Sequence, residues 1–135
     1  MKKLIALLLA VVCLACFASC GEDETESTYL DISEMSTTMA YTQVYNMTNF
    51  PDVFMDKTIK MKGILATDEA QSSYFCGVVD ESACCAAYME FALAGESAET
   101  DYPELGTVVT VEGKFTTYVE DGKTYTKLVD ATMTW

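Results

Sequence analysis

The sequence predicts a mainly β domain, a small five-stranded barrel preceded by one α-helix. From Lys57 onward the apolar residues recur with a period of two, which is typical of strands buried on one face. Two of the expected strands carry a central glycine, Gly63 and Gly113, where a strand can bend. The last two strands are joined by Asp121-Gly122, a pair that suits a two-residue hairpin turn. Long bent strands and a closing hairpin fit a small Greek-key barrel.

The segment before the strands has the spacing of a helix. Asp31 is followed three residues later by Glu34, which resembles a capping box. Apolar residues then recur at helical intervals: Ala40, Tyr41, Val44, Tyr45 and Met47. We therefore expect a helix over about 32–48 that ends at Asn49-Phe50-Pro51.

Five strands are expected after this helix, over about 57–65, 74–79, 86–93, 107–119 and 124–135. Polar loops at 67–73 and 94–106 and a turn at 80–83 separate them. One face of these strands is apolar and should form the core: Ile59, Met61, Leu65, Met89, Phe91, Leu93, Val109, Val111 and Phe115.

The N-terminus has the three parts of a secretory signal. Lys2 and Lys3 precede an apolar run from Leu4 to Phe17, and small residues follow at 18–19. The run is too short to stay in a membrane, because a spanning helix needs about 20 apolar residues. We expect residues 1–19 to be removed, residues 20–30 to form an acidic tether and residues 31–135 to form the folded domain.

The motif Phe17-Ala18-Ser19-Cys20 resembles the lipobox of bacterial lipoproteins, although leucine is usual where this chain has Phe17. The resemblance implies that Cys20 carries a diacylglyceryl thioether and holds the protein on the extracytoplasmic side of a bacterial membrane, in the cell envelope. A second match at Leu14-Ala15-Cys16 fits less well, since it shortens the apolar run. The alternative is an ordinary signal peptide cut near Ala18, which leaves Cys20 unmodified.

Charge narrows the range of functions. Removal of residues 1–19 leaves six lysines against 21 acidic residues, a net charge of −15, and the chain contains no arginine and no histidine. Histidine general bases and zinc-binding imidazoles are therefore excluded, as are guanidinium contacts to phosphate or guanine. Nucleic acid is not expected as a partner, because its phosphates require a basic surface. The lipid is the expected contact with the membrane.

Two blocks of sequence resemble the paired strands of anticodon-binding-type OB-fold barrels, including those of small uncharacterised bacterial lipoproteins: Asp56–Gly63 and Gly106–Gly113. The resemblance covers about 51–133 and implies a Greek-key barrel that binds oligonucleotides or oligosaccharides on one sheet face. This chain departs from the pattern because it lacks a helix between the third and fourth strands. We expect the helix before the first strand to cover the open end of the barrel instead.

Four tyrosines on the expected strands, Tyr74, Tyr88, Tyr118 and Tyr125, are candidates for a binding surface. Exposed tyrosine rings could stack on sugars or hold a peptide. The alternative is structural, since tyrosines on strands can also close the ends of a small barrel.

Three cysteines lie outside the signal region and the expected lipidation site: Cys76, Cys84 and Cys85. Cys76 is expected opposite or nearly opposite Cys84 or Cys85 across a hairpin, where a disulfide would add about 2–3 kcal/mol. Alternatively, the three thiolates converge on Zn²⁺ or Cu⁺, with Asp80, Glu81 or water as a fourth ligand. The third possibility is that the thiols stay buried or free.

Catalysis has little support in the sequence. The absence of histidine rules out Cys-His and Ser-His pairs. The neighbouring acidic residues Asp68-Glu69, Asp80-Glu81 and Glu120-Asp121 lie in expected turns, where solvated carboxylates are ordinary. We therefore expect a non-catalytic binding or assembly module of the cell envelope, with no cofactor, whose partner is an envelope protein or a small ligand. The alternative is a thiolate metal-binding or redox accessory domain that uses the three cysteines.

Overall fold

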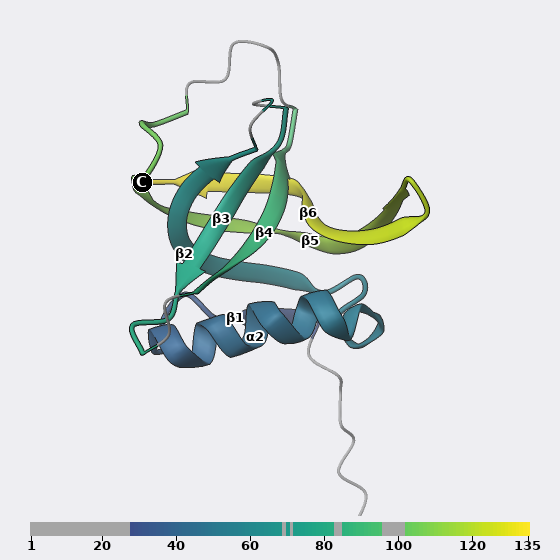
Figure 1. Ribbon diagram of the computed structural model, residues 1–135, viewed down its shortest axis with the longest axis horizontal. Helices are drawn as coiled ribbons and strands as arrows, with labels where there is room; N and C mark the ends of the chain where they lie inside the picture. The colour runs from purple at the N-terminus through teal and green to yellow at the C-terminus, as the bar shows by residue number, and fades with distance from the viewer. Residues whose placement is uncertain (1–27, 69, 71, 83–84, 96–101) are drawn as a thin grey trace, which may run out of the picture.

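The computed structural model describes residues 28–68, 70, 72–82, 85–95 and 102–135 (Figure 1). As predicted, the described part of the chain is mainly β with one α-helix. Along the chain the elements are β1 (Tyr29–Asp31), α2 (Thr37–Asn49), the 3₁₀ helix η2 (Pro51–Val53), β2 (Thr58–Thr67), β3 (Tyr74–Val79), β4 (Ala86–Leu93), β5 (Val108–Glu120) and β6 (Lys123–Thr134). Within the described residues, no helix has the length and apolarity needed to cross a membrane.

Five of the strands form a ring. The neighbours follow the order β2-β3-β4-β6-β5, and β5 pairs again with β2. The β4–β6 pair is parallel, whereas the other four pairs of the ring are antiparallel. This order is that of the five-stranded Greek-key barrel that the sequence predicted.

The ring closes because β2 bends. Its first part, Thr58–Ile64, pairs with β5, and its last part, Ile64–Thr67, pairs with β3. At the bend, a Cβ on Gly63 would lie 2.4 Å from the carbonyl oxygen of Gly77. Only glycine therefore allows β2 to cross β3 at this distance. The other predicted bend, Gly113, coincides with a register shift between Glu112 and Lys114 in the β5–β6 ladder.

The core lies inside this ring and beneath α2. The helix crosses one end of the barrel (Figure 1) and buries Ala40, Val44 and Met47. The expectation that the helix covers an open end is confirmed. The largest fully buried side chains come from the helix, the strands and the segment between β1 and α2: Phe115, Ile32, Met47, Ile59, Met61, Leu65, Met89, Leu128, Val44, Val109, Val111 and Cys76.

The predicted start of the helix is wrong. Asp31 does not cap α2, because its carboxylate accepts hydrogen bonds from the backbone N–H (2.9 Å) and hydroxyl (2.6 Å) of Ser33 and so closes a tight turn. The helix begins five residues later, where the hydroxyl of Ser36 accepts a hydrogen bond from the N–H of Met39 (3.4 Å). Short strand β1, which the sequence did not predict, starts at Tyr29 within the expected tether and pairs in parallel with β2.

The β5–β6 hairpin extends beyond the barrel. Pairing of β5 with β2 stops at Lys114, and pairing of β6 with β4 begins at Lys127. The remainder of the hairpin is a two-stranded ribbon, which curves away from the barrel in Figure 1. Its turn at Asp121 and Gly122 has positive φ values of 49° and 75°, as the Asp-Gly pair predicted.

The close crossing at Gly63 yields a stability prediction. The Gly63→Ala variant should lose about 3 kcal/mol of unfolding free energy, because the added methyl group meets backbone rather than a movable side chain. Gly95→Ala is the control: it also adds a methyl group, nothing lies within 4 Å of it, and its φ of 64° costs about 1–2 kcal/mol. Urea unfolding of both variants measures the difference, and equal losses would contradict a steric role for Gly63.

Candidate functional site

The structure separates two of the three candidate cysteines. Cys76 lies inside β3 and pairs with Met89 across the β3–β4 ladder, whereas Cys85 precedes β4 and lies opposite Asp80. Four residues of strand, about 14 Å, therefore separate the two cysteines along the hairpin. A disulfide needs Cα atoms within about 7 Å, and both thiols are free. The expected position of Cys76 nearly opposite Cys85 is thus wrong in register, and Cys84 lies outside the described residues.

Burial makes Cys76 a poor thiolate. Its side chain is fully buried in the core, and this burial raises the pKa of the thiol from 9.0 to about 12. The thiol is therefore neutral at physiological pH. Because the folded-state pKa is raised, the stability linked to this neutral thiol is present below about pH 9 and is lost as the pH rises toward 12. Cys76 packs as a small apolar side chain.

Asp80, one of the groups considered as a fourth metal ligand, has a structural role. Asp80 is buried, and its carboxylate accepts hydrogen bonds from the N–H of Ser82 (3.0 Å) and from the hydroxyls of Ser82 and Thr38 (2.9 and 3.0 Å). These bonds, first of all those from Ser82, lower the pKa of Asp80. Asp80 thereby ties the β3–β4 turn to α2. Among the described residues, no group of three or more metal-binding side chains comes together.

The four candidate tyrosines do not form one group. Tyr74 packs against the core and stacks on Tyr102, with ring centroids 3.7 Å apart. Its role is the structural alternative, closure of the barrel. The other three lie on the outer side of the sheet, where Tyr88 is 49 % and Tyr125 41 % exposed.

We call this outer surface the tyrosine face, formed by Tyr88, Glu90, Tyr118, Tyr125 and Lys127. Strand alternation directs Tyr88 and Glu90 outward from β4, because Met89 and Phe91 point into the core. Lys127 of β6 pairs with Glu90 in the parallel ladder, which places the base of the ribbon beside β4.

The tyrosine face is held by a small polar network. Glu90 accepts a hydrogen bond from the hydroxyl of Tyr118 and one from Ser73 (3.3 Å), and it forms an ion pair with Lys127 (3.5 Å). The hydrogen bond to Glu90 raises the pKa of Tyr118 above its ordinary value. The Lys127 ammonium lies 4.6 Å from the centroid of the Tyr118 ring.

Tyr125 completes the arrangement from the ribbon. Its ring stacks on Tyr118 with centroids 5.5 Å apart and planes inclined by 24°. Lys127 and Tyr125 thus both contact the ring of Tyr118. Tyr88 lies over Gly77 of the neighbouring strand, where a Cβ would come within 2.6 Å of the Tyr88 ring. The tyrosine face therefore offers two exposed rings held by neighbouring contacts.

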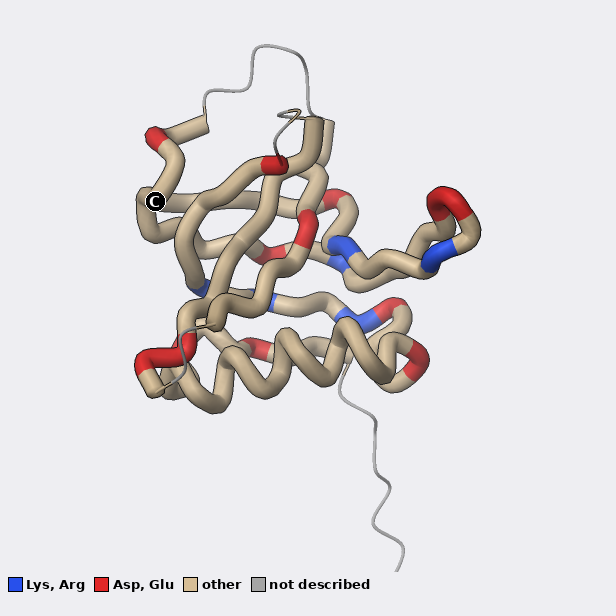
Figure 2. Tube along the Cα trace, viewed as in Figure 1, with Lys and Arg blue, Asp and Glu red and all other residues tan. Residues whose placement is uncertain are grey.

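Charge is distributed unevenly over the fold. Acidic residues occur mainly in turns and at the ends of elements, whereas lysines lie mainly along the strands (Figure 2). The tyrosine face contains one carboxylate and one ammonium, joined as an ion pair. It is therefore a locally balanced region of a strongly acidic chain.

Comparisons of this chain with protein-family models, with curated proteins and with solved structures found no match.

The sequence identified the tyrosines but not the network that fixes them. Neither Glu90 nor Lys127 was singled out from the sequence. Both lie on outward positions of their strands, one acidic and one basic. Their pairing depends on the parallel contact between β4 and β6, which joins segments more than thirty residues apart.

The two described thiols should differ in reactivity. In a Cys84→Ser background at neutral pH, iodoacetamide should modify Cys85, which is exposed, and leave Cys76 unmodified until the domain is denatured. Intact-mass and peptide mass spectrometry before and after unfolding locate the label. Rapid native labelling of Cys76, or a mass two protons lower in the folded form, would contradict its assignment as a buried thiol.

Proposed function

We propose that this chain is a non-catalytic binding module of a bacterial cell envelope, anchored by a lipid on Cys20 and presenting the tyrosine face to a carbohydrate ligand. The observation that carries the proposal is the layered arrangement of Tyr118 and Tyr125 beside the Glu90–Lys127 pair. The location rests on the lipobox-like motif, and the residues around Cys20 lie outside the described part of the chain.

Position favours binding over barrel closure for Tyr125. Barrel-closing tyrosines should pack into an end of the core, as Tyr74 does. Tyr125 instead lies on a ribbon that extends past the ring and is 41 % exposed. Ordered aromatic rings at an accessible surface lose little conformational freedom on binding, which favours affinity.

A carbohydrate suits the chemistry of this surface better than a polyanion. Ring faces of tyrosine provide flat apolar area, while the nearby carboxylate and ammonium supply fixed hydrogen-bonding groups. A net charge of −15 after loss of residues 1–19 repels phosphate-rich ligands. OB-fold barrels use the same face for oligonucleotides or oligosaccharides, and charge favours the second class here.

The thiolate alternative has less support. Zn²⁺ or Cu⁺ binding needs deprotonated cysteines that converge, whereas burial favours the neutral thiol of Cys76 and the strand register separates it from Cys85. Asp80 is already engaged by Ser82 and Thr38. We therefore prefer the binding module without a thiolate centre.

Replacement of the exposed rings should weaken carbohydrate binding. We expect Tyr125→Ala and Tyr88→Ala each to reduce affinity for a bound neutral oligosaccharide at least about tenfold, equivalent to about 1.4 kcal/mol. A panel of immobilised neutral oligosaccharides, followed by calorimetry with the best binder, provides the measurement.

The control for these variants is Tyr45→Ala, since Tyr45 is 54 % exposed on α2, away from the tyrosine face. This variant should bind like the parent chain. Absence of binding across the whole panel, or equal losses in all three variants, would show that the tyrosine face is not a carbohydrate site.

Lipid anchoring can be tested separately. In a bacterial host, the Cys20→Ser variant should lose incorporation of labelled fatty acid and move from the membrane fraction to the soluble extracytoplasmic fraction. Cys16→Ser is the matched control and should remain lipidated. Retention of the label in Cys20→Ser, or its loss in Cys16→Ser, would refute the assignment of Cys20.

A further inference from the structure

Strands β2 and β3 separate where β2 bends. Their ladder runs from Thr67–Tyr74 to Ile64–Gly77 and stops there, although β2 continues back to Thr58 and β3 continues to Val79. Along its first residues, β2 pairs with β1 instead of β3. This pairing ends at the hydrogen bond from the Ile32 N–H to the Lys60 carbonyl (2.8 Å). A split therefore remains between Lys62 on β2 and Val79 on β3.

The main chain on both sides of this split is oriented toward it. Successive peptide groups of a strand point to opposite sides. The Leu65 N–H donates to the Thr107 carbonyl on the β5 side, whereas the Lys60 carbonyl accepts from the Ile32 N–H on the other side. Because Lys62 lies two residues after Lys60, its backbone N–H and carbonyl also point away from β5 and into the split.

The same alternation applies to β3. Asp80 bonds across to Cys85 on the β4 side, so the peptide groups of Val79 point away from β4 and into the split. Neither the β1–β2 ladder nor the β2–β3 ladder includes Lys62 or Val79. Two strand segments thus face each other with main-chain donors and acceptors that no partner strand of the described fold takes up.

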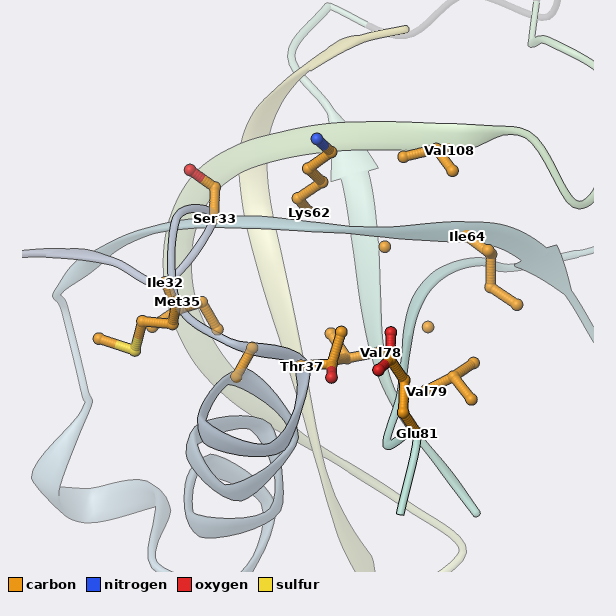
Figure 3. A pocket seen from close by; sticks show the side chains of 13 residues that line it. Ile32, Ser33, Met35, Thr37, Lys62, Ile64, Val78, Val79, Glu81 and Val108 are labelled. Carbon is orange, nitrogen blue, oxygen red and sulfur yellow. The ribbon is translucent and has the colours of Figure 1, made fainter. Parts of the chain in front are cut away.

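A cavity of about 400 Å³ occupies the split, within the range of about 300–1,000 Å³ that is common for small-ligand sites. Lys62 and Val108 lie along one side, and Thr37, Val79 and Glu81 along the opposite side (Figure 3). Most of the residues that line the cavity are apolar: Ile32, Met35, Ala40, Ile64, Val78, Val79 and Val108.

Two glycines line the cavity. Gly63 and Gly77 both lie at the point where the two strands separate, and neither contributes a side chain there. Val79 and Val108 are 45 % and 53 % exposed, which leaves apolar surface at the opening. Lys62 is exposed, and no ion pair links it to another described residue.

We propose that this cavity binds a short apolar peptide in extended conformation, by strand addition between Lys62 and Val79. The peptide backbone would exchange hydrogen bonds with the main chain of these two residues, and an apolar side chain would enter the cavity beside Ile64. The C-terminal carboxylate of the peptide would lie at Lys62, and the N-terminal ammonium group of the peptide would lie at Glu81.

A peptide fits better than a purely apolar ligand because the split presents backbone donors and acceptors as well as apolar area. This site borders the tyrosine face at Gly77, over which Tyr88 lies, whereas Tyr118 and Tyr125 do not line it.

The test is a two-dimensional ¹H–¹⁵N NMR titration of the secreted chain carrying Cys20→Ser. The probe is the unblocked tripeptide Ala-Val-Ala, together with its analogue methylated at the central amide nitrogen. We expect saturable shifts of the Lys62, Gly63, Gly77 and Val79 amides with the first peptide. The methylated analogue should bind at least tenfold more weakly, because it cannot donate that hydrogen bond.

Variants identify the contacts. Val79→Pro removes the N–H that points into the split without removing a β3–β4 ladder bond, and it should reduce affinity at least tenfold while the spectrum stays dispersed. Lys62→Ala should weaken binding of the free peptide, but not of its C-terminal amide. Lys123→Ala is the control, because Lys123 is an exposed lysine on the ribbon. It should change the affinity for neither the free peptide nor its C-terminal amide.

Each contrary outcome overturns the proposal. It fails if Ala-Val-Ala causes no saturable shifts, if methylation has no effect, or if the shifts lie at Tyr118 and Tyr125 instead. The last outcome would transfer peptide binding to the tyrosine face. Carbohydrate binding by the tyrosine face can succeed or fail independently, since Tyr125, the ring replaced in Tyr125→Ala, does not line the cavity.

Discussion

The barrel depends on the close crossing of β2 over β3 at Gly63. One strand must pair with β5 along one part and with β3 along the other for five strands to close into a ring. This demands a change of direction within a single strand, and a side chain at the crossing would collide with the carbonyl of Gly77. Closure leaves most strand edges of the ring paired, which limits the exposed strand edges of a small β domain.

The same bend explains the unusual elements around the barrel. A strand that leaves its neighbour exposes peptide groups and apolar surface on the side it leaves. Here β1 takes up part of that edge, and Ile32 is buried immediately after it. Helix α2 then covers the end of the core with Val44 and Met47. Because β1 is only three residues long, its pairing ends before the β2–β3 ladder begins, and the cavity lies in the interval.

Local sequence patterns correctly predicted the helices and strands that are determined by neighbouring residues. The boundaries of β3 and β4 were predicted to the residue, since alternating apolar residues and polar turns define them. The start of α2 was misplaced because Asp31 and Ser36 both have side chains that can cap, and the choice between them depends on whether the preceding residues join β2. The distance between Cys76 and Cys85 depends on the length of the turn, which composition does not define. Likewise, the Glu90–Lys127 pair requires knowledge of the parallel β4–β6 contact.

Charge gives the two candidate surfaces a common property. Acidic residues greatly outnumber lysines in this chain, and the ion pairs among the described residues include Lys60 with Asp31, Lys114 with Asp56 and Lys127 with Glu90. The tyrosine face includes Lys127 and Glu90, and the cavity is lined by Lys62 and Glu81. Each surface thus combines one cation and one anion with apolar area, while the surrounding protein repels anions. Ligands with little net negative charge should be accepted at both places, so shape and hydrogen bonding must provide the selectivity.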